Sequence, residues 1–238
     1  VGVCIGLSSI RFALDGRFEI AIIAIIVASI IDGLDGRIAR LIKGTSDFGK
    51  ELDSLTDFVS FGIAPVFILY FWELNNLGKL GWAISLIYSV CCVLRLARFN
   101  LTKVDKTKLW KNNYFEGIPS PAGGLLILTP LFLELSDLKI NFDIKFIVPY
   151  FTVLIAFLLV SKIPTLSLKK ISISPKTTVF ILLAIGMTFI SLLFYTFKTL
   201  LVFCLVYLVS IPISFLMYKR QSKKDLSETS EDEHEDVL

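Results

Sequence analysis

The sequence predicts an all-α integral membrane protein, built as a polytopic bundle of about eight transmembrane helices. Hydrophobic residues make up 55% of the 238 residues and the mean hydropathy is +0.75, values far from those of soluble globular domains. Several apolar runs also approach the roughly 20 residues that a helix needs to cross the hydrocarbon core. The chain therefore has the composition of a membrane bundle.

Eight apolar segments separated by polar links are the predicted helices. In chain order they are 1–14, 18–42, 52–72, 79–99, 120–136, 144–161, 177–197 and 199–218. The first is too short to span a bilayer and the chain starts at Val1, so we expect a missing N-terminal piece and a truncated first helix. The second contains AIIAIIVASII, the fourth ends in CCVLRLARFN, and the fifth begins at the Gly/Pro-punctuated YFEGIPSPAGG. The last two are apolar but less distinctive.

Positive charge is concentrated in alternate links, which predicts the orientation of the bundle. Most Lys and Arg residues lie in 37–50, 95–111, 162–176 and 219–224. We expect the protein to lie in the cytoplasmic (inner) membrane. These segments and both termini should face the cytoplasm. The tail, residues 219–238, is basic and then acidic, and its composition predicts disorder.

Four of the five aspartates within residues 32–57 stand out because they lie at helical spacing in this apolar chain. Two stripes at helical spacing combine acids with small residues: one is Asp32, Asp35, Gly36 and Ala39, and the other is Gly49, Asp53 and Asp57. At about 100° per residue, each stripe lies on one side of its helix. A short polar link joins the two helices, so the two acidic faces can oppose each other.

Carboxylates in such a position indicate a function, because an acid at mid-bilayer costs about 2.5–3.5 kcal/mol. Converging carboxylates repel one another unless divalent cations neutralise them, and hard oxygen ligands suit Mg²⁺ or Mn²⁺. We therefore predict a divalent-metal site with four ligands: Asp32, Asp35, Asp53 and Asp57. A divalent-cation transporter with intramembrane acids is a less favoured alternative, which leaves the small residues of the stripes unexplained.

Other kinds of catalytic and binding site find little support in the sequence. The single histidine, His234, lies in the acidic tail, which leaves Ser–His or Cys–His catalysis without its base. There is no P-loop, no dinucleotide-binding glycine motif and no basic-aromatic stripe suited to nucleic acid. Chemistry in this chain must therefore depend on carboxylates and metal.

Three further segments could contribute to the same site. SFGIAP begins at Ser60, directly after Asp57, and allows close backbone approach and a kink at Pro65, or is simply a notch for helix packing. CCVLRLARFN carries Arg95 and Arg98, which could hold a phosphate or a carboxylate, or anchor the helix by the positive-inside rule. YFEGIPSPAGG could form a pocket edge, or only a loop and helix start.

The acidic region matches a known motif at every fixed position. The pattern D-x2-D-G-x2-A-R-x8-G-x3-D-x3-D is filled by Asp32, Asp35, Gly36, Ala39, Arg40, Gly49, Asp53 and Asp57. In this it resembles the CDP-alcohol phosphatidyltransferases, and the likeness extends over about residues 1–160. Members usually carry a Pro-Asn and a nearby Thr before the first of these helices, and that element is absent here. Together with the three further segments, the motif is most similar to the family's serine-using bacterial branch.

The resemblance implies a reaction and residue roles. The expected reaction transfers a phosphatidyl group from CDP-diacylglycerol to L-serine, giving phosphatidylserine and CMP. Asp57 is the expected general base, and all four aspartates the expected ligands of two Mg²⁺ or Mn²⁺ ions. The expected donor-binding residues are Gly36, Ala39, Arg40 and Gly49. Residues that could bind serine or phosphate are Arg95, Arg98 and Ser60.

Some choices remain open at this point. Relatives that share the aspartate pattern use glycerol 3-phosphate, inositol phosphate or choline as acceptor, and those acceptors remain alternatives to serine. A homodimer is expected from the resemblance alone. We divide the chain into a catalytic transmembrane core (1–161), C-terminal transmembrane helices (162–218) and a cytoplasmic tail (219–238). The diacylglycerol part is expected to enter sideways from the bilayer, while CDP and serine reach the site from the cytosol.

Overall fold

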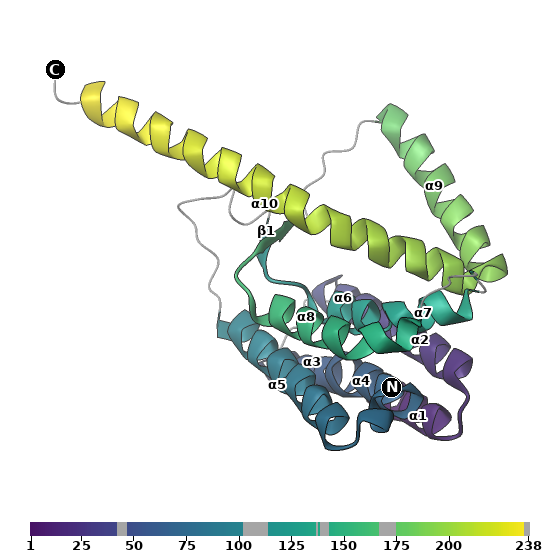
Figure 1. The fold of residues 1–238 in the computed structure, drawn as a ribbon. Helices are drawn as coiled ribbons and strands as arrows, with labels where there is room; N and C mark the ends of the chain where they lie inside the picture. The colour runs from purple at the N-terminus through teal and green to yellow at the C-terminus, as the bar shows by residue number, and fades with distance from the viewer. Residues whose placement is uncertain (42–46, 102–113, 137, 139–142, 167–174, 236–238) are drawn as a thin grey trace.

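The computed structural model describes residues 1–41, 47–101, 114–136, 138, 143–166 and 175–235. Almost all of the elements in these ranges are helical, which confirms the predicted all-α class (Figure 1). The elements of the N-terminal half are α1 (Gly2–Leu14), α2 (Phe18–Leu41), α3 (Asp47–Asp57), the π-helical η1 (Phe58–Ile63), α4 (Ala64–Trp72), the 3-10 helix η2 (Leu74–Leu77) and α5 (Lys79–Leu101). Those of the C-terminal half are β1 (Tyr114–Glu116), α6 (Ser120–Ile127), α7 (Thr129–Leu135), η4 (Ile144–Ile147), α8 (Val148–Val160), β2 (Pro164–Leu166), α9 (Pro175–Phe194) and α10 (Thr196–Glu235).

The helices follow the predicted apolar segments, but eight membrane spans are not confirmed. Within the described residues, three helices are long and apolar enough to cross a bilayer: Phe48–Trp72, Lys79–Leu101 and Thr196–Gln221. The shorter apolar helices are Gly2–Leu14, Ile144–Val160 and Phe180–Phe194. Their lengths and composition support an integral membrane protein, while the number of spans stays a prediction.

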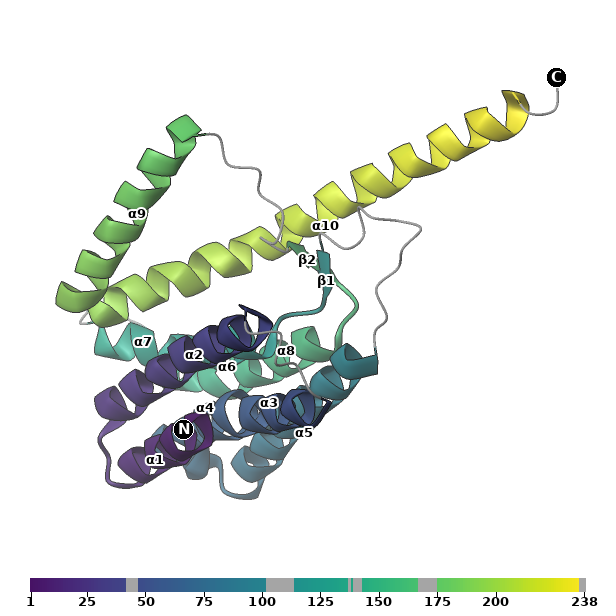
Figure 2. The same cartoon turned by 180° about the vertical axis from the view of Figure 1, so that it is seen from behind.

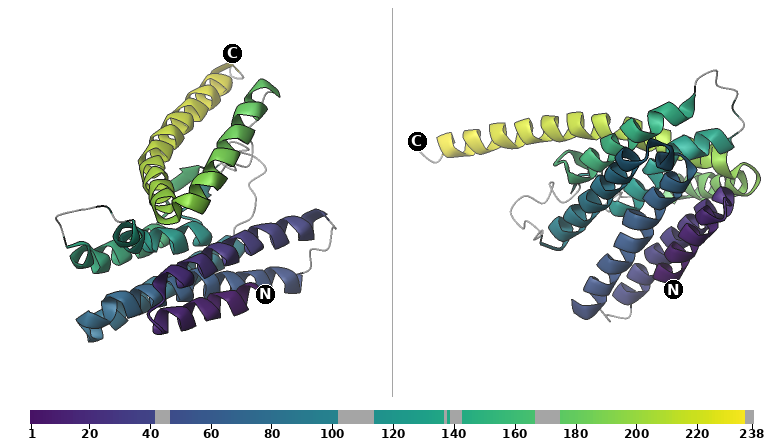
Figure 3. Two further views of the ribbon diagram at one scale, coloured as in Figure 1. Left: turned by 90° about the vertical axis from the view of Figure 1, so that its right-hand side faces the viewer. Right: turned by 60° about the horizontal axis from the view of Figure 1, so that its bottom comes forward.

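The helices pack in layers. A turn at Gly16, whose φ is +73°, joins α1 to α2, and this pair packs against α4 and η1. Helices α6–α8 form a further layer next to α5, and α10 lies across this layer (Figure 3). Helix α9 contacts α10 near the residues that join them and then diverges from it (Figure 2). The core between the layers contains Phe61, Tyr88 and Phe132, which are fully buried.

A π-helical segment interrupts the long helix from α3 to α4, directly after Asp57. The N–H of Ala64 donates to the carbonyl of Val59, five residues back. Proline has no N–H, so Pro65 cannot donate to the Phe61 carbonyl as an α-helix would require. That carbonyl accepts instead from the hydroxyl of Tyr88 on α5, at 3.0 Å. The wider turn therefore ties η1 to α5 beside the acidic region, and π-helical turns are often found at functional sites.

A small antiparallel ribbon joins two distant parts of the chain. Residues 114–116 pair with 164–166, with Phe115 opposite Thr165. The Thr165 hydroxyl donates to the carbonyl of Gly117 at 2.8 Å, and Gly117 has a φ of +76° that favours glycine. The sequence predicted only a Gly/Pro-punctuated helix start here. The strands form because two segments about 50 residues apart in the sequence pair with each other, which no local pattern indicates.

Helix α10 is longer than predicted. It continues to Glu235 and so includes residues 219–235, where the composition predicted disorder. The reason lies in the local sequence, because this stretch has neither Gly nor Pro to end a helix and is rich in Lys and Glu, which are good helix formers. The division of the chain at residues 161 and 218 stays a prediction.

Candidate metal and catalytic site

Three carboxylates from two helices converge at one end of the bundle. One oxygen atom from each of Asp32, Asp35 and Asp53 lies within 4.8 Å of the other two. Oxygen atoms that bind one Mg²⁺ lie about 3–4 Å apart, because the metal–oxygen distance is about 2.1 Å. Small side-chain rotations would therefore let these three residues hold a hard divalent cation. The two acidic faces oppose each other as the helical period predicted.

A contact between α3 and α5 helps to hold this arrangement. Near the end of α5, the amide group of Asn100 donates to the Ser54 hydroxyl at 2.9 Å. Ser54 lies next to Asp53, so the tie fixes the rotation of α3. Asp35 and Asp53 are exposed and Asp32 is half-buried. The acidic cluster is therefore open on one side to polar molecules.

Asp57 lies deeper than the other acids, at the junction of α3 and the π-helical turn. Its carboxyl group interacts directly with that of Asp32 and is within electrostatic range of Asp53 and Arg95. Its Oδ1 is buried and has no hydrogen-bond partner among the described residues. A buried carboxylate oxygen without a partner is costly, which points to a proton donor or cation in the functional state. Asp57 thus borders the three-carboxylate cluster without being part of it.

Arg95 provides the positive charge beside Asp57. Only 8% of the residue is exposed, and its guanidinium group donates a hydrogen bond to the hydroxyl of Ser120, the first residue of α6. It also lies over the ring of Phe99, 5.4 Å from the centroid. Since buried arginines require anionic or hydrogen-bonding partners, this position favours a binding role over simple positive-inside anchoring.

Two other predicted binding residues make mainly packing contacts. Arg98 donates to the carbonyl of Val160 at 2.6 Å and so caps the C-terminal end of α8. Ser60 is buried against α1, where its hydroxyl donates to the carbonyl of Gly2 at 3.5 Å. A side chain on Gly6 would come within 3.0 Å of the Ser60 hydroxyl. These contacts favour the helix-packing alternative for Ser60 and a structural role for Arg98.

The predicted donor-binding residues are only partly described. Gly36 lies on α2 one residue after Asp35, and a Cβ built there would meet no described atom within 4 Å. Gly49 lies in the first turn of α3, one turn before Asp53. The side chains of Ala39 and Arg40 lie outside the described part of the chain. Room beside Gly36 is compatible with a bound donor.

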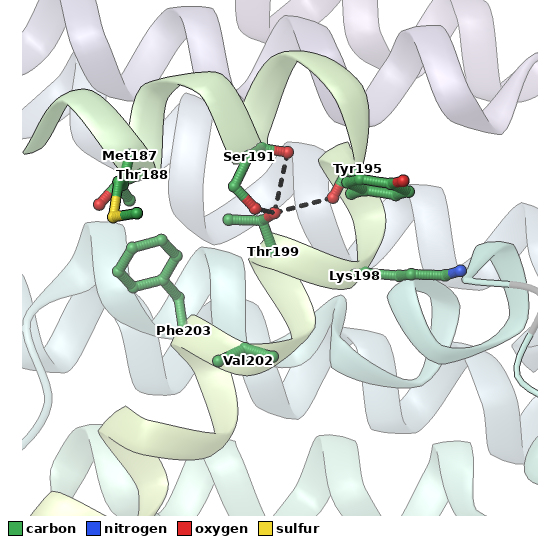
Figure 4. A pocket seen from close by; sticks show the side chains of 8 residues that line it. All are labelled: Met187, Thr188, Ser191, Tyr195, Lys198, Thr199, Val202 and Phe203. Carbon is green, nitrogen blue, oxygen red and sulfur yellow. Dashed lines mark hydrogen bonds between the residues drawn. The ribbon is translucent and has the colours of Figure 1, made fainter. Parts of the chain in front are cut away.

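A separate hollow of about 460 Å³ lies between α9 and α10 (Figure 4). Its lining is mostly apolar, and its polar residues include Ser191 and Thr199, whose hydroxyl groups are 2.7 Å apart. Lys198 lies 5.7 Å from the centre of the Tyr195 ring. No carboxylate is among the residues that line this hollow, so it is distinct from the acidic cluster.

The sequence missed two features of the site, the π-helical turn and the contact between Arg95 and Ser120. Pro65 after a run of small residues was a signal for the first, since it indicated an irregular helix. Ser120 lay in a segment already selected for its Gly and Pro residues, but no local sequence pattern indicated that Arg95 would be its hydrogen-bond partner. Such a contact depends on how α5 and α6 pack.

Comparisons with known proteins agree with this geometry. A Mycobacterium leprae protein named CDP-diacylglycerol–serine O-phosphatidyltransferase is 35% identical over 215 residues, which are 90% of this chain and 71% of that protein. Its namesake in Mycobacterium tuberculosis H37Rv is 32% identical over 90% of this chain and 75% of that protein. The namesake in Helicobacter pylori J99 is 35% identical over 79% and 78%, respectively. Residues 1–158, which include all four aspartates, match the CDP-alcohol phosphatidyltransferase family, and the chain belongs to that family.

Proposed function

We propose that this membrane enzyme transfers the phosphatidyl group of CDP-diacylglycerol to the hydroxyl group of L-serine, forming phosphatidylserine and CMP. The observation that carries the proposal is the convergence of Asp32, Asp35 and Asp53 in a chain of this family. The choice of serine is supported by relatives of that name, which align with most of the chain. The serine oxygen forms a bond to the phosphatidyl phosphorus, and the phosphorus–oxygen bond to CMP breaks.

Two divalent cations, Mg²⁺ or Mn²⁺, would be held by the four aspartates. The proximity of the Asp32, Asp35 and Asp53 oxygens supports three of these ligands, and the interaction of Asp57 with Asp32 supports the fourth. When bound, such cations neutralise the pyrophosphate and stabilise the charge that develops on CMP as it leaves. Without bound cations, the four carboxylates would repel the anionic donor.

Asp57 acts as the general base in this proposal. It takes the proton of the serine hydroxyl group as the oxygen attacks the phosphorus. The unpartnered, buried Oδ1 supports this role, because a hydroxyl donor from the acceptor would satisfy it. The π-helical turn after Asp57 and the bond from Tyr88 to the Phe61 carbonyl hold the base in place.

Arg95 binds the carboxylate of serine. Its guanidinium group lies within electrostatic range of Asp57, so one small molecule could contact both residues. A guanidinium group has five N–H donors and pairs with carboxylates in a forked geometry. Ser120 and Phe99 restrict its rotation. The acceptor would thus be held by its acidic end while its hydroxyl group faces the base.

Gly36, Ala39, Arg40 and Gly49 bind the CDP part of the donor, while the acyl chains stay in the bilayer. The room beside Gly36 supports close approach of the donor to α2. The site faces the cytosol from the inner membrane, because cytidine nucleotide and serine are water-borne and the links near the site are rich in Lys and Arg. A homodimer completes the proposal by analogy with the family.

Purified protein with CDP-diacylglycerol, Mn²⁺ or Mg²⁺ and one labelled acceptor at a time tests the proposal. L-serine should give labelled lipid and CMP, whereas glycerol 3-phosphate, inositol phosphate and choline should give neither. Lipid labelling by one of those acceptors alone would keep the chemistry and overturn the choice of serine. Cation flux into vesicles without CMP release would indicate a transporter.

A further inference from the structure

The hollow between α9 and α10 is lined by side chains whose polarity changes in one direction. Lys198 lies at one end, the hydroxyl groups of Ser191 and Thr199 lie in the middle, and Phe203 lies at the other end (Figure 4). The Thr188 hydroxyl group at the apolar end is bonded within its own helix, where it donates to the carbonyl of Ala184. The lining therefore passes from a cation through hydroxyl groups to apolar side chains.

This order matches the layers of a bilayer. Lys198 is the third residue of the apolar span Thr196–Gln221, so it should lie where that span meets the lipid headgroups. Phe203 is five residues further on, which is about 7.5 Å along the helix. Since the headgroup layer on each side of a bilayer is about 5–7 Å thick, Phe203 should reach the hydrocarbon. Figure 2 shows the α9–α10 junction at the end of the bundle where α1 turns into α2.

The polar residues of the hollow have capacity to bind a ligand. Lys198 has its ammonium group 5.7 Å from the centre of the Tyr195 ring, and no acid is among the residues that line the hollow. Thr199 is only 9% exposed, and its hydroxyl oxygen is 2.7 Å from that of Ser191, with either atom able to donate. When Thr199 donates, the proton of Ser191 is available to another acceptor, such as an ester carbonyl.

An anionic lipid complements this lining. A phosphate group would pair with Lys198, whereas the ammonium group of a zwitterionic lipid would find no acid among the lining residues. The volume of about 460 Å³ lies in the range of ligand-binding cavities. Met187 is 74% exposed and Phe203 is 50% exposed, so the hollow is open at its side. A lipid could therefore enter from the bilayer without leaving it.

We propose that the hollow between α9 and α10 binds one anionic glycerophospholipid. Its phosphate pairs with Lys198, an ester group accepts from Ser191, and one acyl chain packs against Val202 and Phe203. The lipid fills the space that α9 leaves as it diverges from α10. This site is separate from the acidic cluster, and the proposal does not depend on the proposed function.

Native mass spectrometry of the purified protein, titrated in detergent with dioleoylphosphatidylglycerol, tests the proposal. Lys198→Gln should weaken binding of one lipid by about tenfold to a hundredfold, because a hydrogen bond between charged groups is lost. The matched control is Lys79→Gln, which removes an exposed lysine at the start of α5, outside the hollow, and should change binding by less than about twofold. Equal binding by the two variants would indicate nonspecific surface lipid and overturn the proposal.

A fluorescent reporter locates the lipid. Phe203→Trp places an indole in the hollow, and Phe189→Trp is its control on α9, where Phe189 is 64% exposed but outside the hollow. The vesicles contain phosphatidylcholine and a small share of phosphatidylglycerol with brominated acyl chains. Quenching should be greater for Phe203→Trp, and adding Lys198→Gln should abolish the excess. Equal quenching at the two positions, or an excess that survives Lys198→Gln, would contradict the proposal. Weaker quenching of Phe203→Trp would indicate that a second copy of the chain covers the hollow, which would also overturn it.

Discussion

Replacement of Asp57 by asparagine tests the catalytic base with little disturbance of the fold. The two side chains have nearly the same shape, and Oδ1 of Asp57 has no described hydrogen-bond partner to lose. Burial and the neighbouring carboxylates of Asp32 and Asp53 disfavour a negative charge at this position, and a neutral amide avoids that cost. The thermal midpoint of the metal-free protein should therefore be equal to or higher than that of the wild type.

The expected loss of activity is large because an amide cannot take up the proton of the acceptor. A positioned general base contributes about 10²–10⁴-fold to a rate, which corresponds to about 3–5 kcal/mol on the barrier. We expect kcat to fall by that factor, with the KM for serine changed by less than about threefold, since Arg95 is intact.

The assay is CMP release from CDP-diacylglycerol at saturating serine and Mn²⁺, measured for the wild type and for Asp57→Asn. Glu51→Gln is the matched control, because it also neutralises an exposed acid on α3 but lies outside the cluster. It should keep wild-type activity. An Asp57→Asn enzyme with more than about a tenth of the wild-type kcat would refute the assignment of Asp57 as the base.

Three further predictions concern the metal, the acceptor and the packing. Asp53→Asn should weaken binding of Mn²⁺, measured by its electron spin resonance signal in titrations of the purified protein, and unchanged binding would remove Asp53 from the ligand set. Arg95→Gln should raise the KM for serine more than tenfold while the KM for CDP-diacylglycerol stays within about twofold, because a bond between charged groups is lost; equal effects on both would contradict a carboxylate-binding role. Gly62→Ala should lower the thermal midpoint, since the new Cβ would lie 2.7 Å from Cδ2 of Phe58 and 3.0 Å from Sγ of Cys92, and overpacking costs about 1–3 kcal/mol. Gly186→Ala on α9, which meets no described atom within 4 Å, is its control and should not lower the midpoint.

Periodicity in the sequence was sufficient to predict the acidic cluster. Asp32 and Asp35 share a face because they are three residues apart, and the 3.6-residue period carries Asp53 onto the facing side of α3. The apolar runs likewise predicted α2 and α5 to within a few residues. These features depend on local spacing, which a sequence contains directly.

Features that depend on packing could not be predicted in the same way. The apolar run that became α10 contains no signal that selects Cys204 and Ile211 as inward-facing residues, because lipid-facing and protein-facing positions are both apolar. The ribbon between β1 and β2 joins segments about 50 residues apart, and the π-helical turn needs Tyr88 to satisfy the carbonyl that Pro65 leaves free. Ser60 was selected for its place after Asp57, yet it packs against α1.

The most direct test of the central claim compares the two products in one reaction. Wild-type protein in vesicles with CDP-diacylglycerol, labelled serine and Mn²⁺ should form CMP and phosphatidylserine in equal amounts. Chelation should stop both, added metal should restore both, and the Asp32→Asn, Asp53→Asn double variant should form neither. Continued formation of CMP and phosphatidylserine after chelation, or by the double variant, would contradict a reaction that depends on metal held by the aspartate cluster.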